Sequence, residues 1–231
     1  PQYRIEMIHL ACYAHRKDPF SRGCDMSKID FTKELRQLYA PPTGDFAVVD
    51  VPPLQYLMLD GTGDPNTAPA YVSAVETLYS VAYRAKFISK NELGRDYVVP
   101  PLEGLWWAED MTSFTSARDK RHWSWTMMIL LPEWITPAMF ARACEDVERK
   151  RAPANLPALR REAYYEGLSA QIMHIGPYDD EGPTLARLHD EWLPQHGYAE
   201  RGKHHEIYLS DPRRAAPARM RTVLRQPIRA R

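Results

Sequence analysis

Cysteine is scarce in this chain, and the cysteines present do not form a recognisable framework. There are three, Cys12, Cys24 and Cys144, which is an odd number, and no two of them form a C-x-x-C pair. Small disulfide-held domains and structural zinc sites need paired or closely spaced cysteines. The pattern therefore argues against both classes and predicts a reducing, cytoplasmic location.

A net charge of one sign is also missing. The chain has 30 Lys and Arg residues against 30 Asp and Glu residues, so no overall field draws it to nucleic acid or to an anionic membrane. The C-terminal run RRAAPARMRTVLRQPIRAR is locally basic, and we interpret it as a solvated tail. No apolar run approaches the roughly 20 residues of a membrane-spanning helix. We expect neither a nucleic-acid nor a membrane partner.

Several motifs of phosphate, dinucleotide and metal chemistry are absent. The sequence contains no G-x-x-x-x-G-K-[ST], G-x-G-x-x-G, H-E-x-x-H or G-x-S-x-G. The GTGD stretch at 61–64 is typical of a turn. His204 and His205 are adjacent, so on a strand they face opposite sides and cannot both bind one metal ion. We expect no metal and no cofactor.

Helical and strand periods alternate along the first half of the chain. Thr136 and Pro137 form a cap and first-turn signal for one helix, and Pro69 stands near the start of another. The expected elements are a helix at 29–39, strands at 46–53 and 55–64, a helix from a cap at Asn66 or Thr67 to about Phe87, β-rich runs at 96–107 and 122–132 joined by a long hairpin connection, and a helix from 137 to about 150.

The second half repeats this order after a Pro- and Ala-rich stretch. Its expected elements are a long strand at 161–180 that is bulged at Gly167, a helix at 184–196 with Leu185, Leu188 and Trp192 inward, and strands at 203–209 and 218–226. Each half then reads as strand, helix and two strands. This order predicts an α+β fold of two tandem strand-helix-strand-strand modules, with pseudo-twofold symmetry around a central ligand groove.

The same pattern predicts how the chain divides. Residues 1–25 show no consistent period and are expected to be a disordered leader or a mis-assigned start, with Met26 as the true beginning. The first module, with its N-terminal helix, is expected at 26–150. A linker at 151–161 and the second module with its basic tail at 162–231 complete the chain.

The stretch KHHEIYLSDP at 203–212 contains the most informative residue of the sequence. Ile207 and Leu209 alternate with polar residues, so Glu206 and Tyr208 share the other side of a strand. One interpretation is a carboxylate on a solvated sheet face. The other is a ligand-facing acid, because a carboxylate among aromatic rings suits a delocalised cation, and a desolvated carboxylate is a better general base.

Aromatic residues recur where a flat ligand would be held. In PPLEGLWWAED, Trp107 shares a strand side with Glu103, while Trp106 lies on the other. Each tryptophan either fills the core, covers a sheet edge or contacts a ligand. Tyr71 and the Tyr79/Tyr83 pair form a ridge on the long helix that is either the floor of a groove or an ordinary half-buried face. The stripe of Trp123 and Trp125 is expected to be core.

Four segments carry a resemblance to a known family: KIDFTKELRQLY, YVVPPLEGLWW, IGPYDDEGPTLARLHDEW and HHEIYLSDP. In this order they resemble the GyrI-like small-molecule-binding proteins, specifically the stand-alone subfamily without a DNA-binding domain, over about residues 26–228. The resemblance implies two strand-helix-strand-strand modules around a groove for lipophilic, often cationic, drug-like molecules. It also implies that Glu206 is the acid that faces the ligand.

Some stand-alone members resemble hydrolases that open the strained cyclopropane of DNA-alkylating natural products. For such an activity Glu206 would orient or deprotonate water, and Tyr71, Trp106 or Trp107, and Tyr208 would clasp the planar substrate. The leading hypothesis is thus a cytoplasmic xenobiotic-binding protein, with this hydrolysis as an activity to test. The alternative is a non-catalytic regulator of a protein partner, similar to a gyrase inhibitor, for which the sequence identifies no partner.

Overall fold

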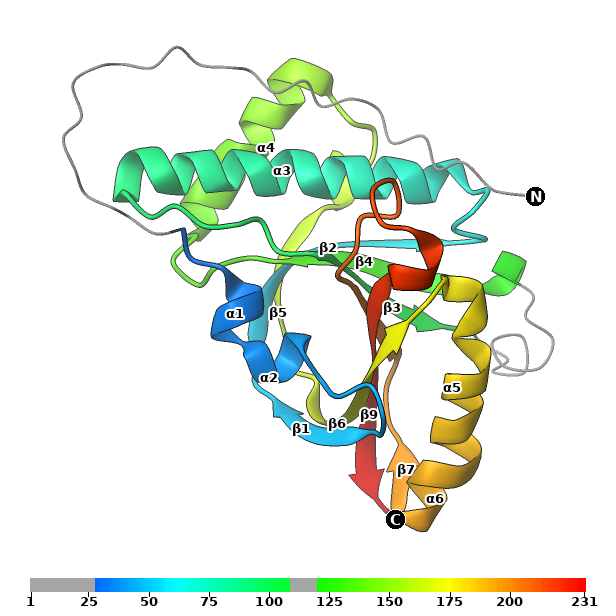
Figure 1. The fold of residues 1–231 in the computed structure, drawn as a ribbon. Coiled ribbons are helices and arrows are strands. Elements are labelled where there is room, and N and C mark those ends of the chain that lie inside the picture. Colours follow the sequence, from blue (N-terminus) through cyan, green and yellow to red (C-terminus); the bar gives the residue numbers. More distant parts are fainter. Residues whose placement is uncertain (1–27, 109–119) are drawn as a thin grey trace.

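The computed structural model describes residues 28–108 and 120–231 (Figure 1). The expected leader at 1–25 and most of the expected hairpin connection after Trp107 lie outside the described residues. Within the described part of the chain, nine strands form one antiparallel sheet in the order β1-β6-β9-β8-β3-β4-β2-β5, with β7 beside β9. The strands are β1 Ala47–Val51, β2 Leu54–Thr62, β3 Leu102–Trp107, β4 Ser124–Leu130, β5 Arg160–Tyr164, β6 Gly167–Ile175, β7 Tyr198–Glu200, β8 His204–Tyr208 and β9 Arg221–Ala230.

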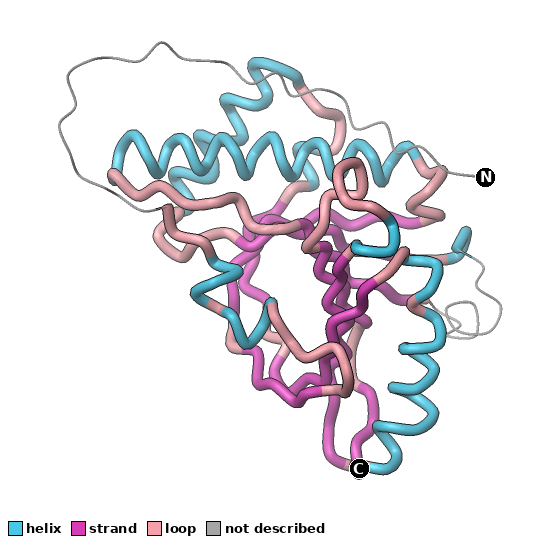
Figure 2. Tube along the Cα trace, in the orientation of Figure 1, coloured by secondary structure: helices cyan, strands magenta, loops and turns pink. Residues whose placement is uncertain are grey.

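The sheet closes on itself because two long strands are each broken in the middle. Pro52 and Pro53, which cannot donate ladder hydrogen bonds, separate β1 from β2, and Gly167, with a φ of 68°, begins β6 directly after β5. β1 pairs with β6 while β2 pairs with β5. Since β2 also pairs with β4 and β6 with β9, the strand order leaves the β1–β2 segment of the chain at β1 and comes back to it at β2, with β1 and β5 at the two ends of the order. Figure 2 shows the strands curling around an interior.

Helices cover the sheet on different sides (Figure 1). They are α1 Phe31–Glu34, α2 Arg36–Tyr39, α3 Pro69–Leu93, α4 Pro137–Arg151, α5 Gly182–Ala186, a π-helical turn at Arg187–Trp192 and α6 Leu193–Gln195. α3 packs on β2 and β4 through Leu78, Val81 and Ala85, which are fully buried, and α4 packs on α3. α2 places Leu38 and Tyr39 among apolar residues of the sheet interior.

The helix signals in the sequence are confirmed in type, with one corrected cap. Thr136 caps α4, since its hydroxyl accepts a hydrogen bond from the Met139 amide at 3.2 Å. The long helix α3 has Ala68, not Asn66 or Thr67, as its N-cap residue, and no side chain caps it. It also continues past Phe87, because neither Gly nor Pro interrupts it until Gly94, which adopts a left-handed conformation with a φ of 65°.

The interpretation of the basic C-terminal run as a solvated tail is wrong for most of its length. β9 takes up residues 221–230, and Arg225 within it is only 1% exposed. Apolar residues such as Val223 and Leu224 favour burial of this strand in the sheet. Arg225 is buried with them because it forms an ion pair with Glu166. The mixed α/β character with a large antiparallel sheet is confirmed, while the pseudo-twofold relation of the halves and the domain boundaries stay predictions.

Gly61 gives a first testable prediction about this packing. It lies opposite Trp125 in the β2–β4 pairing, and a Cβ at Gly61 would collide with the indole ring, which is 1% exposed and has no room to move. We expect Gly61→Ala to lower the free energy of unfolding, measured by urea denaturation, by about 1–3 kcal/mol. Gly44→Ala is the control, because a Cβ there meets nothing within 4 Å. Equal unfolding midpoints for the two variants would contradict this packing.

Candidate functional site

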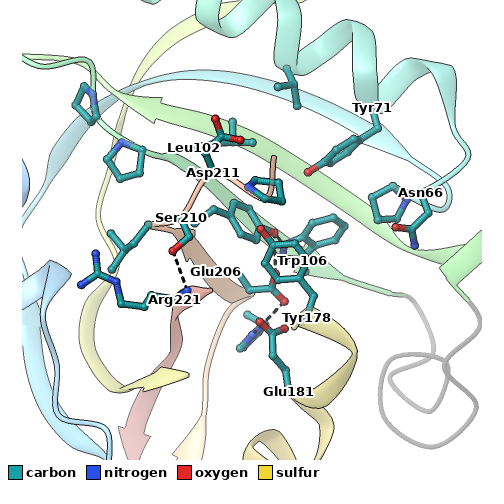
Figure 3. A pocket seen from close by; sticks show the side chains of 18 of the residues that line it. Asn66, Tyr71, Leu102, Trp106, Tyr178, Glu181, Glu206, Ser210, Asp211 and Arg221 are labelled. Carbon is teal, nitrogen blue, oxygen red and sulfur yellow. Dashed lines mark hydrogen bonds and ion pairs between the residues drawn. The ribbon is translucent and has the colours of Figure 1, made fainter. Parts of the chain in front are cut away.

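A cavity of about 1390 Å³ lies between α3, the outer faces of β3 and β8, and the segment around α5. Figure 3 shows side chains from these elements converging on it. Strand pairing sets its floor, because Trp106 lies opposite His204, Gly104 opposite Glu206 and Leu102 opposite Tyr208. The even-numbered residues of both strands therefore project from the same face of the sheet.

Gly104 leaves the room above β3 that the site needs. A Cβ at this position would lie 2.8 Å from Trp106 Nε1 and 3.2 Å from the Met127 sulfur, so any larger residue would displace the indole. The paired residue on β8 is Glu206. The absent side chain thus lets the Trp106 ring and the Glu206 carboxylate share one small volume.

A chain of hydrogen bonds orients the carboxylate of Glu206. Trp106 Nε1 donates to the Tyr208 hydroxyl at 3.0 Å, and this hydroxyl donates to Glu206 Oε2 at 2.7 Å. His204 Nε2 lies 3.7 Å from Glu206 Oε1. Burial lowers the pKa of His204 to about 3, so its imidazole is neutral near pH 7 and this contact is polar rather than ionic.

Burial also sets the protonation of Glu206, whose residue is 9% exposed. It raises the pKa of Glu206 to about 7, against the opposing effects of the Tyr208 hydrogen bond and the positive charges of Lys120 and His205. The carboxylate and the carboxylic acid are therefore both populated near neutral pH. A group with this pKa is suited to accept or donate a proton under physiological conditions.

Aromatic rings form the walls around this carboxylate. The Tyr71 ring, which projects from α3 toward the cavity in Figure 3, stacks on Trp106 with centroids 6.3 Å apart and an angle of 28°. Trp123 meets Trp106 edge-on at 5.7 Å, and Tyr178 meets Tyr208 edge-on at 5.5 Å. Such walls favour flat ligands, and the quadrupoles of the rings attract cations.

Four of the five site residues expected from the sequence line this cavity: Tyr71, Trp106, Glu206 and Tyr208. The fifth, Trp107, does not line it. As the next residue on β3, Trp107 projects from the opposite face of the sheet, where Lys203 Nζ lies 3.3 Å from its ring centroid. The Trp107 ring therefore forms a cation–π contact with Lys203 instead of facing the cavity.

Of the lining residues that the sequence did not assign to the site, three stand out: Trp123, Tyr178 and Glu181. Trp123 was expected to be core, and it is indeed buried, but it also borders the cavity. The strand expected at 161–180 ends at Ile175, so Tyr178 and Glu181 lie in the turn that follows it, and the fold brings this turn to β8. Glu181 is 4% exposed, and Figure 3 shows its side chain extending toward Glu206 from the opposite wall.

A separate cluster of charges fills the interior on the other face of the sheet. His205 donates hydrogen bonds from both ring nitrogens, from Nδ1 to Glu166 and from Nε2 to Glu103, each at 3.0 Å. Arg225 binds Glu166 Oε2 at 3.0 Å, and Tyr39 donates to Glu103 at 2.7 Å. Glu103, which the sequence places near the tryptophans, is thus an interior residue with 0% exposure and not part of the cavity.

The charges of this interior cluster stabilise one another. Burial alone would lower the pKa of His205, but the charge of Glu166 and the bonds to both carboxylates raise it to about 9. Burial alone would raise the pKa of Glu166, but His205 and Arg225 lower it to about 2. All three groups are therefore charged near neutral pH, and each depends on the others for its charge in this dry environment.

The described part of the chain contains neither a group of side chains placed to bind a metal ion nor a helix able to cross a membrane. Among residues 28–108 and 120–231, no three His, Cys, Asp or Glu side chains are grouped so that they could hold a metal ion. No helix in the same ranges combines the length and the apolar character that crossing a membrane requires.

Several solved structures are similar to this chain over most of its length. A conserved protein of uncharacterized function from Listeria innocua is 37% identical, with a TM-score of 0.80, over 87% of this chain and all of its own. Two structures described as hydrolases from the same organism are 35% and 36% identical, with TM-scores of 0.75 and 0.77 and the same coverage. Among proteins of curated function none matches the chain.

A family model extends over most of the chain. The GyrI-like small-molecule-binding domain matches residues 45–229, a range that contains all of the sheet except the last residue of β9, and that includes Tyr71, Trp106, Glu206 and Tyr208. The large aromatic cavity is in keeping with a domain that binds small molecules. The chain belongs to the GyrI-like small-molecule-binding family.

Proposed function

We propose that this protein binds planar, lipophilic, cationic molecules in the cavity, with the positive charge of the ligand next to Glu206. The observation that carries the proposal is the position of this carboxylate, 9% exposed and surrounded by Tyr71, Trp106 and Tyr208. A delocalised cation restores the electrostatic balance of the buried carboxylate and stacks on the rings at the same time. The biological role that follows is the sequestration of foreign compounds in the cytoplasm.

We further propose that the site hydrolyses cyclopropane-containing alkylating compounds. Two relatives are described as hydrolases, and Glu206, with a pKa of about 7, is suited to act as the base. Glu206 accepts a proton from water, the water oxygen bonds to a cyclopropane carbon, and the ring C–C bond breaks. The released electron pair moves into the conjugated dienone, whose oxygen becomes a phenolate.

The developing phenolate of this reaction needs a hydrogen-bond donor. Tyr208 already donates its hydroxyl proton to Glu206, whereas Tyr71 lies across the cavity on α3. Burial and the charge of Glu206 raise the pKa of Tyr71 well above its ordinary value, so its hydroxyl keeps its proton near pH 7. We therefore assign Tyr71 as the donor that stabilises the developing phenolate.

Titration with a rhodamine-type dye that is a permanent cation tests the binding proposal. We expect Glu206→Gln to weaken dye affinity about tenfold, because a desolvated charged contact contributes about 1.5–3 kcal/mol. The natural protein should bind more tightly as the pH rises through about 7, since deprotonation creates the negative charge that the cation contacts. The variant should show no such rise, because its amide does not titrate.

The controls separate the loss of a specific charge from other effects. Glu145→Gln removes a negative charge from an exposed position on α4 and is expected to leave the affinity unchanged. An uncharged aromatic ligand of similar size should bind to the natural protein and to Glu206→Gln with similar affinity. If Glu206→Gln keeps both the affinity and the pH profile of the natural protein, the proposed role of Glu206 is wrong.

A further inference from the structure

The cavity extends well beyond the surroundings of Glu206, along the whole first half of α3. Residues four positions apart lie on the same side of a helix, and one such stripe of α3 lines the cavity: Tyr71, Val75, Tyr79 and Tyr83. At a rise of 1.5 Å per residue, the twelve positions from Tyr71 to Tyr83 span about 18 Å. Tyr71 stands over Trp106 at one end, and Tyr83 marks the other.

The end at Tyr83 is built differently from the end at Glu206. The rings of Tyr79 and Tyr83 lie 6.3 Å apart at an angle of 32°, and Val98 and Pro100 line the same cavity. Tyr83 is 41% exposed, so this end opens toward solvent. Its surfaces are flat and largely apolar.

Two of the charged residues that line the cavity, Arg213 and Asp211, form an ion pair with each other. Arg213 lines the cavity and forms two hydrogen bonds with Asp211, from Nε at 2.8 Å and from a terminal nitrogen at 2.6 Å. Its guanidinium is therefore held in place and its charge is neutralised by its neighbour. An outer end of this kind favours a neutral aromatic group, in contrast to the acidic inner end.

We propose that the ligand is an elongated molecule of two or more linked aromatic units, whose outer unit is neutral and occupies a subsite formed by Tyr79, Tyr83, Val98 and Arg213. The volume supports this, because 1390 Å³ exceeds the roughly 300–1,000 Å³ of a typical drug-sized site. A single planar cation would fill only the inner end. This inference rests on the proposed function, which assigns the cationic unit to Glu206.

Two dyes that share a cationic end test the outer subsite. The long probe is a bisbenzimidazole dye with one cationic end, and the short probe is its cationic half with a single benzimidazole. We expect Tyr83→Ala to weaken the long probe about three- to tenfold, the equivalent of one lost aromatic pair, and to leave the short probe unchanged. Fluorescence titration measures both affinities, and circular dichroism confirms that the variant is folded.

Two matched variants make the result specific. Tyr83→Phe keeps the ring and should retain the affinity for the long probe. Phe87→Ala removes an exposed aromatic residue one turn further along α3, outside the cavity lining, and should affect neither probe. Unchanged long-probe affinity in Tyr83→Ala, or an equal loss for both probes, would overturn the outer subsite.

The same pair of probes distinguishes failure of this inference from failure of the proposed function. Glu206→Gln should lower the affinity for both probes by the same factor, because both place their cationic end at the inner carboxylate. If Glu206→Gln weakens both while Tyr83→Ala weakens neither, the proposed function stands and the outer subsite is wrong. If Glu206→Gln weakens neither probe, the assignment of the cation to Glu206 is wrong.

Discussion

Replacing Arg225 by methionine is expected to lower the free energy of unfolding by about 3–5 kcal/mol, the cost of removing one partner from a buried ion pair. Arg225 is 1% exposed and binds Glu166, the Gln171 side chain and the Leu38 carbonyl. Methionine fills similar space but donates no hydrogen bond. Among the described residues, the substitution therefore leaves His205 as the ion-pair partner of the Glu166 carboxylate, whose residue is 2% exposed.

Urea denaturation measures this loss, and a surface arginine provides the control. Arg160 also contacts two carboxylates, Asp60 at 2.9 Å and Glu162 at 2.6 Å, but its side chain is 36% exposed. Because water screens such pairs, Arg160→Met is expected to change the unfolding free energy by no more than about 1 kcal/mol. Equal effects of the two substitutions would show that the interior cluster does not hold the sheet together.

If the protein hydrolyses cyclopropane-containing alkylators, replacing Glu206 by glutamine is expected to lower kcat by about 10²–10⁴-fold, the usual contribution of a positioned general base. Glutamine keeps the shape of the side chain and can still accept the 2.7 Å hydrogen bond from Tyr208. It cannot accept a proton from water at neutral pH. Mass spectrometry of the products formed from such a compound measures the ring-opened, hydrated species directly.

The choice of control for this experiment depends on the fold. Glu103 is close to Trp106 in sequence, but Glu103→Gln would disturb the bonds to His205 and Tyr39 in the sheet interior, so a loss of activity would be ambiguous. Glu145→Gln, on the exposed surface of α4, removes the same charge without touching either cluster. Turnover by Glu206→Gln that equals that of the natural protein would remove Glu206 from the mechanism.

Local signals in the sequence predict a large part of the fold correctly. Thr136 and Pro137 mark the start of α4 because a side-chain hydroxyl and a missing amide hydrogen both act within one turn of the chain. Strand alternation likewise predicts that Glu206 and Tyr208 share a face. The missed cap of α3 is a local error: Pro69 takes the first helical position, so the residue before it, Ala68, is the N-cap although its side chain cannot cap the helix.

The sequence by itself predicted the family, the approximate positions of most helices and strands, and a candidate set of Tyr71, Trp106, Trp107, Glu206 and Tyr208, four of which line the cavity, because these depend on motif order and on periods within single elements. The tertiary structure decided which tryptophan faces the cavity, and that Tyr178 and Glu181 join it from the turn that follows β6. It also decided that Arg225 is buried in a charged cluster. These outcomes depend on which strands pair and in which register, and that is determined by contacts between residues far apart in the chain.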